Sequence, residues 1–184
     1  MMRAAVVAAP GRIEIQEVEI PQPQPGQVQV RIEGCGVCAS SLPLWQGQPW
    51  FTYPFPHGAP GHEAWGRVTA LGTDVEGLNV GDRVTMLGYG GYAEYDVNDA
   101  QAVARLPAAL DGQPFPGEAV GCAFNVIKRC GIQRGDTVAI IGIGFLGALL
   151  TRLATDAGAH VIAISRRPFS LDIARAYGAA ETIA

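Results

Sequence analysis

The sequence has little charge, no basic cluster and no long apolar run. Gly and Pro interrupt each apolar stretch well before the length that crosses a bilayer, so we expect no membrane span. The 184 residues carry 13 Lys and Arg against 17 Asp and Glu, which gives no footprint of a nucleic-acid-binding surface. The start, from Met1 to Val7, lacks the long apolar region and cleavage site of a secretory signal. We therefore expect a cytoplasmic protein without nucleic-acid or membrane partners.

Cysteine is also scarce, with four residues in the chain. Two disulfides are weakly supported in a chain of this size without a secretory signal, so reduced thiols are expected. Cys35 and Cys38 form a Cys-x-x-Cys pair, but no second pair completes a four-cysteine zinc site. A redox pair or half of a zinc knuckle is the alternative. We favour Cys38 as a metal ligand beside a structural Cys35.

Glycine and proline are plentiful, at 24 and 13 residues, and favour a turn-rich β region in the first part of the chain. Residues 12–18 and 27–32 alternate between apolar and polar side chains, as half-buried strands do. Two further strands are expected at 66–71 and 82–87, and a short helix at 39–45. These features predict an irregular β-barrel domain over residues 1–117. The aromatic loop that follows residue 45 is either core filling or one wall of a substrate pocket.

The pattern changes after Pro116. A helical stretch at 118–128 precedes a buried, β-branched strand at 137–141. A glycine-rich turn, a helix at 148–157, a strand at 160–164, a helix at 168–177 and a strand starting at 181 follow. This order is the first half of a doubly wound parallel sheet, which we assign to residues 118–184 as a truncated Rossmann domain.

Four side chains could hold a metal ion. A thiolate, an imidazole and a carboxylate make a good zinc set with one position left open for substrate. The candidates are Cys38, the adjacent pair His62 and Glu63 in Gly61-His62-Glu63, and Glu118. The alternatives are a small buried residue for Cys38 and, for Glu118, a carboxylate favoured by a helix N-terminus.

The glycine-rich turn predicts a dinucleotide site, because it follows a strand and opens a helix. We expect the cofactor to contact Gly142, Gly144, Phe145, Leu146 and Gly147. The second strand of this unit ends in Ser165-Arg166-Arg167, where an NAD-selective site would have Asp or Glu. A hydroxyl and two guanidinium groups suit a ribose 2′-phosphate, so NADP(H) is preferred over NAD(H). The alternative is that both arginines simply solvate a loop.

The order and spacing of four segments resemble the zinc-dependent medium-chain dehydrogenase/reductase superfamily, of the alcohol, sorbitol and threonine dehydrogenase type. The resemblance covers the whole chain but about half of a full-length member. It implies a GroES-like catalytic domain, then a Rossmann domain, and a homo-oligomer at full length. The segments are Gly34-Cys35-Gly36-Val37-Cys38-Ala39-Ser40, Gly61-His62-Glu63, Gly77-Leu78-Asn79-Val80-Gly81-Asp82-Arg83-Val84 and Gly142-Ile143-Gly144-Phe145-Leu146-Gly147.

The resemblance implies roles for individual residues. Cys38 and His62 are the first two zinc ligands. Glu118 falls where polyol-dehydrogenase-like members carry a Glu close to the metal, and Glu63 can bind zinc directly or exchange with a water. Ser40 matches the hydroxyl of the proton relay, and can also cap the following helix.

The sequence departs from the family pattern at two positions near these ligands. Ser41 stands where members commonly have an acidic residue that orients the zinc-bound imidazole. Pro43 stands where many have a histidine that extends the proton relay. The cysteine-rich lobe that holds a structural zinc is missing, so we expect at most one zinc per chain.

These observations predict zinc-dependent, reversible hydride transfer between a small-molecule secondary alcohol or polyol (or its ketone) and NADP(H). Two alternatives stay open. A zinc-free quinone reductase of the same superfamily would not need Cys38 with Gly61-His62-Glu63. A truncated, non-catalytic relative that binds metal or a partner would explain a chain with half of a Rossmann sheet.

Overall fold

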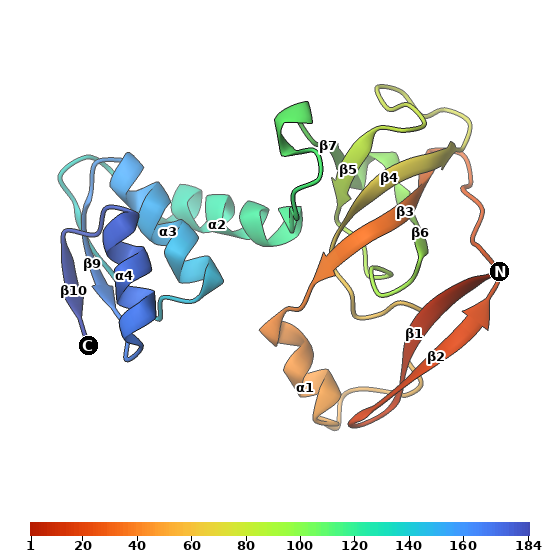
Figure 1. Ribbon diagram of the computed structural model, residues 1–184, viewed down its shortest axis with the longest axis horizontal. Coiled ribbons are helices and arrows are strands. Elements are labelled where there is room, and N and C mark those ends of the chain that lie inside the picture. The colour runs from red at the N-terminus through yellow and green to blue at the C-terminus, as the bar shows by residue number, and fades with distance from the viewer. The chain divides into compact units, whose positions relative to one another are not determined.

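The computed structural model describes all residues from 1 to 184, and the chain folds into two compact units, Met1–Glu118 and Ala119–Ala184. Figure 1 traces the chain through both units. None of the helices combines the length and the apolar character that crossing a membrane requires.

The first unit is built from antiparallel strands. A five-stranded sheet has the order β6-β3-β4-β5-β7, and β1 and β2 form a separate two-stranded ribbon. The strands are β1 Met2–Ala9, β2 Arg12–Val18, β3 Gln27–Gly36, β4 Glu63–Leu71, β5 Arg83–Met86, β6 Tyr95–Asp99 and β7 Val103–Arg105.

The core of this unit lies on one face of the sheet. Alternate residues of β3, β4 and β5 are almost fully buried there, as the period of two along a strand requires. A bridge between Ala4 and Ala93 ties β1 to the segment that leads into β6, which curls the β elements around the core. The expected GroES-like irregular barrel is confirmed by this arrangement. The buried cluster comprises Val28, Val30, Ala64, Val68, Val84 and Met86.

Short helices join the strands of the first unit. The helix expected after Cys38 is present in two pieces, the 3-10 helix η1 Ala39–Ser41 and α1 Leu42–Trp45. Pro43 fits there because it lies in the first turn, where its missing N–H costs nothing. Two further 3-10 helices are η2 Ala100–Ala102 and η3 Ala108–Leu110.

The second unit is a parallel α/β arrangement. Its three strands, β8 Thr137–Ile141, β9 His160–Ile164 and β10 Glu181–Ile183, have the order β10-β9-β8. Helices α3 Phe145–Asp156 and α4 Pro168–Ala176 connect them and contact each other (Figure 1). Helix α2 Gly117–Cys130 precedes β8. This is the first half of the doubly wound sheet that the sequence predicts.

One boundary differs from the expectation. We expected the first crossover helix to begin at Ala148, but α3 begins at Phe145. Gly144 is the N-cap residue, and its carbonyl accepts a hydrogen bond from the Ala148 N–H at 2.9 Å. The predicted turn residues Phe145 and Leu146 therefore belong to the first helical turn.

Candidate metal and nucleotide sites

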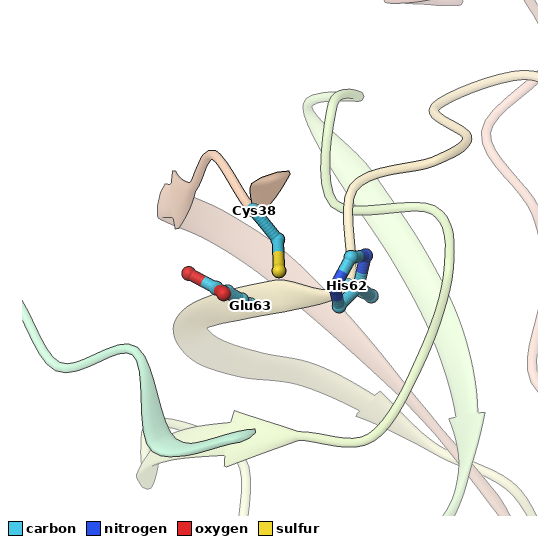
Figure 2. Close-up of side chains that lie close together, drawn as sticks. All are labelled: Cys38, His62 and Glu63. Atoms are coloured by element: carbon cyan, nitrogen blue, oxygen red, sulfur yellow. The ribbon is translucent and has the colours of Figure 1, made fainter. Parts of the chain in front are cut away.

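Three predicted ligands converge where β3 and β4 meet. Cys38 lies just after β3, His62 just before β4, and Glu63 is the first residue of β4. Antiparallel pairing sets Gly36 opposite Glu63, which brings these distant segments together. Figure 2 shows the Cys38 sulfur between the Glu63 carboxylate and the His62 ring.

The spacing of these groups fits a zinc ion. One ligand atom from each of Cys38, His62 and Glu63 lies within 4.8 Å of the other two. Zinc bonds of about 2.0 to 2.3 Å place two tetrahedral ligands roughly 3.6 Å apart, so small side-chain adjustments suffice. A thiolate and a carboxylate together balance the charge of Zn²⁺. The donor set of sulfur, nitrogen and oxygen is one that zinc accepts, and it leaves a fourth position free.

Gly36 leaves room for the Glu63 carboxylate. A Cβ atom at Gly36 would lie 2.0 Å from Oε2 of Glu63 and 3.0 Å from its Cβ. Glu63 is buried, with 9% of its surface exposed. The absence of a side chain at Gly36 therefore determines where this carboxylate can lie.

Two polar contacts and one ring contact hold His62. Its Nδ1 lies 2.8 Å from the carbonyl oxygen of Pro60, and its Nε2 lies 3.4 Å from the Ser40 hydroxyl. The ring of Tyr89 lies against it, with centroids 5.7 Å apart and planes tilted by 36°. The sequence analysis missed Tyr89 and Pro60, since nothing in the linear pattern of either loop points to a histidine ring.

Cys35 differs from Cys38, the predicted ligand. Burial raises the pKa of the Cys35 thiol to about 11, with a further contribution from the nearby Glu63 and Asp96 charges, although a backbone hydrogen bond opposes the shift. Cys35 is also not among the three side chains whose ligand atoms converge. Tyr92 donates a hydrogen bond to the Gly36 carbonyl at 3.2 Å and supports the same end of β3. A structural role therefore fits Cys35.

Glu118 is not among the three converging ligands. It lies in the first turn of α2, where a carboxylate suits the helix dipole. The preceding residue, Gly117, donates its N–H to the Thr85 hydroxyl at 3.2 Å, and Thr85 in turn donates to the Ala64 carbonyl at 3.0 Å. These bonds hold the start of α2 against β4, one residue beyond Glu63. Use of Glu118 as a ligand stays a prediction.

The two serines after Cys38 differ in their contacts. Ser40 is exposed and reaches the His62 ring as described, whereas the Ser41 Oγ is buried without a hydrogen-bond partner. Neither side chain caps a helix. The alternative role of Ser40 as an N-cap is therefore not seen, and its role in proton transfer stays a prediction.

The predicted nucleotide turn lies between β8 and α3. Gly142 has a φ of +92°, a left-handed conformation that glycine adopts without strain. A Cβ at Gly147 would lie 2.1 Å from the Gly142 carbonyl oxygen, so the helix can approach the turn only with glycine there. Gly144 faces open space on the side where a Cβ would be. These are the three roles that a dinucleotide turn assigns to its glycines.

The segment after β9 carries the residues predicted to select the cofactor. Ser165 continues the sheet by donating its N–H to the Ile183 carbonyl, and its hydroxyl accepts a hydrogen bond from the Arg167 N–H at 3.3 Å. Arg166 and Arg167 are exposed and make no ion pair. Both guanidinium groups are therefore available to an anion.

Comparison with known proteins adds family relationships. Residues 24–108 match the family model of the alcohol dehydrogenase GroES-like domain. An alcohol dehydrogenase from Rhizobium meliloti is 34% identical over 97% of this chain, and the chain spans 62% of that relative's length.

Solved structures agree with this relationship. An Escherichia coli alcohol dehydrogenase in complex with NADH superposes with a TM-score of 0.88 at 27% identity, over 99% of this chain and 62% of its own. A dehydrogenase from Sinorhizobium meliloti bound to NADP gives a TM-score of 0.87 at 30% identity, over 99% of this chain and 61% of its own.

Proposed function

Because the chain belongs to the medium-chain dehydrogenase/reductase superfamily, we propose that it carries the metal ligands and the pyrophosphate turn of a zinc-dependent alcohol dehydrogenase. The proposed reaction is reversible hydride transfer between a secondary alcohol or polyol and NADP(H). The observation that carries this proposal is the convergence of Cys38, His62 and Glu63 at the junction of β3 and β4.

The proposed chemistry divides between the metal and the side chains. Bound zinc polarises the substrate oxygen as a Lewis acid. Cys38 and His62 hold the ion, while Glu63 either completes the set or gives way to a water molecule. The Ser40 hydroxyl, 3.4 Å from His62 Nε2 and exposed, accepts the alcohol proton and passes it to solvent.

The proposed cofactor is NADP(H), bound through the turn before α3. The first turn of α3 offers free backbone N–H groups to the pyrophosphate. Arg166 and Arg167 favour the 2′-phosphate, since they lie after β9 where no carboxylate repels it. Relatives with either cofactor are known, so this preference rests on these two side chains.

The cofactor preference is tested by Arg166→Ala. We expect NADPH affinity to fall by roughly tenfold or more and NADH affinity to stay constant, because only NADPH carries the 2′-phosphate. Arg152→Ala removes an exposed arginine elsewhere in the same unit and serves as the control. An unchanged NADPH/NADH affinity ratio in Arg166→Ala would contradict the assignment.

Exposed apolar residues next to the predicted metal ligands indicate the kind of substrate that the site accepts. Val37 and Leu42 flank the Cys38 segment and are 84% and 52% exposed, and Tyr89 lies against His62. We therefore propose an uncharged alcohol with an apolar part as the substrate.

The first test of the metal site is zinc content by elemental analysis of protein purified without added metal. We expect about one zinc per chain in the parent and a large loss in Cys38→Ser. Cys130→Ser is the matched control, because this exposed thiol lies at the end of α2. Zinc-free, well-folded parent protein would reject the proposal and favour a zinc-free reductase. Zinc without NADP-linked turnover would favour a non-catalytic, metal-binding relative.

A further inference from the structure

The His62 ring has two uncharged hydrogen-bond partners. Its Nδ1 lies 2.8 Å from the Pro60 carbonyl oxygen, and its Nε2 lies 3.4 Å from the Ser40 hydroxyl. A carbonyl oxygen can only accept a hydrogen bond, so Nδ1 must carry a proton. The neutral ring is then the Nδ1–H tautomer, and the lone pair available to a metal is on Nε2.

The loop that carries the Pro60 carbonyl is buried and held on both sides. Residues 58–61 are buried. The Gly58 N–H donates to the Ala5 carbonyl of β1 at 2.8 Å, and the Gly58 carbonyl accepts from the Tyr92 N–H at 3.0 Å. On the other side, Gly61 accepts a hydrogen bond from the Gly91 N–H at 2.8 Å. The position of the carbonyl is thus set by the fold and not by a mobile surface loop.

Ser41 offers no alternative partner. Its Oγ is buried and makes no hydrogen bond, so it does not bond to the His62 ring. The resemblance of the sequence to zinc-dependent dehydrogenases implies an acidic residue at this position that orients the imidazole. A hydroxyl without a partner therefore occupies the place of the usual orienting group.

We propose that the Pro60 peptide carbonyl replaces that acidic side chain as the positioning group of His62, and presents Nε2 to the metal with an uncharged outer partner. The metal part of this inference rests on the proposed function, whereas the hydrogen bond does not. An outer carboxylate makes a zinc-bound imidazole a stronger donor, and a peptide carbonyl adds no charge. The negative charge at this centre comes from Cys38 and Glu63.

The proposal is tested by long-range ¹H–¹⁵N correlation spectra of the 184-residue chain with ¹⁵N-labelled histidine. The chain has three histidines, and His62→Gln assigns the signals of interest. In metal-free protein near pH 8 we expect one protonated and one unprotonated ring nitrogen in His62, with the proton on Nδ1. After addition of ¹¹³Cd²⁺, we expect ¹¹³Cd coupling at Nε2 alone.

The Ser41→Ala variant tests whether the Ser41 hydroxyl, rather than the Pro60 carbonyl, positions His62. Near-UV circular dichroism checks that the variant is folded. We expect the same His62 tautomer and a ¹¹³Cd²⁺ affinity within about threefold of the parent, since the hydroxyl contributes no bond. An Nε2–H tautomer in the parent, or a tautomer change or a tenfold loss of affinity in folded Ser41→Ala, would overturn the proposal. An intact Nδ1–H tautomer without any ¹¹³Cd coupling would instead reject the proposed metal function and leave the hydrogen bond to Pro60 standing.

Discussion

At the scale of single residues, the space beside Gly36 matters to the proposed metal site as much as the predicted ligands do. Gly36 lies opposite Glu63 in the β3–β4 pairing, and its missing Cβ leaves room for the carboxylate. A carboxylate on a flexible side chain can move when this space is filled, but it then leaves the neighbourhood of Cys38 and His62. Metal binding should therefore be more sensitive to Gly36 than folding is.

We expect Gly36→Ala to weaken zinc binding by roughly tenfold or more with little change in the fold, because Oε2 of Glu63 must move away from a Cβ placed 2.0 Å from it. Competition with a chromophoric chelator measures the affinity. Gly121→Ala on α2 is the control, since its Cβ meets nothing within 4 Å and its stability should rise by about 0.5–1 kcal/mol. Equal zinc affinities in Gly36→Ala and the parent would show that Glu63 does not need this position.

A second residue-scale effect concerns acid stability. Hydrogen bonds from the Arg3 backbone N–H and guanidinium lower the pKa of Glu94 below its usual value of 4.5. A lowered carboxyl pKa stabilises the folded state at pH values above the unfolded pKa, and this contribution is lost as the pH falls through the lowered folded value. The pair is exposed, so the effect is small and sensitive to salt.

We expect Glu94→Gln to lower Tm slightly at pH 7, and the difference from the parent to shrink as the pH falls below 4.5. Thermal unfolding followed by circular dichroism between pH 7 and pH 3 at low salt measures it. Glu76→Gln, at an exposed position of the same unit, is the control. A Tm difference that grows toward low pH would have the wrong sign for this explanation.

At the scale of elements, two glycines in the turn from β8 into α3 are expected to have different roles, one in packing and one in cofactor binding. Gly147 is buried and its Cβ would meet the Gly142 carbonyl oxygen at 2.1 Å, whereas a Cβ at Gly144 meets nothing within 4 Å. The same substitution should therefore act on different properties at the two positions. Gly144 has an extended backbone with a φ of −93°, which alanine also adopts.

We expect Gly144→Ala to fold normally and bind NADPH more weakly, because the added methyl group occupies the space where the backbone approaches the pyrophosphate. Gly147→Ala should instead destabilise the second unit, since helix and turn must separate. Thermal unfolding and fluorescence titration with NADPH distinguish these outcomes. Unaltered NADPH binding by Gly144→Ala would place the pyrophosphate elsewhere.

Helix α2 is the element that leads from one unit to the other. Thr85 holds its first residue, Gly117, and bonds at the same time to the Ala64 carbonyl of β4. Its last residues lead toward β8, and Ile127 packs against the core of the second unit.

At the scale of the whole molecule, the two units have separate cores. The second core is built from Ile140, Ile143, Ala154, Val161, Ala163 and Ala174 and shares no residue with the first. Each core buries apolar area on its own, which is the main source of stability in a domain. A change in one core should accordingly leave the site in the other unit intact.

We expect Val161→Ala to destabilise the second unit by about 2 kcal/mol, because Val161 is fully buried and two methyl groups are lost. Zinc affinity should stay at the parent value. Val126→Ala at an exposed position of α2 is the matched control and should change stability little. Loss of zinc from Val161→Ala at temperatures where it remains folded would show that the two units depend on each other.

The sequence by itself determined the order of elements and most of the ligand candidates. Strand and helix periods are local properties, and so is the glycine spacing between β8 and α3, so they can be read along the chain. The fold class follows from that order, because alternating strands and helices leave few ways to build a parallel sheet. Cys38, His62 and Glu63 were proposed as ligands because their donor atoms suit zinc and because the local sequences around them resemble those of zinc-dependent dehydrogenases.

Tertiary structure alone decided how these candidates are arranged. Pairing of β3 with β4 places Cys38 beside His62, and this register depends on side chains far apart in the sequence. The Pro60 carbonyl and the Tyr89 ring carry no linear signal, because backbone atoms and loop aromatics acquire a role only when the chain folds around them. The contacts that orient His62 therefore come from the packing of loops, which no local pattern specifies.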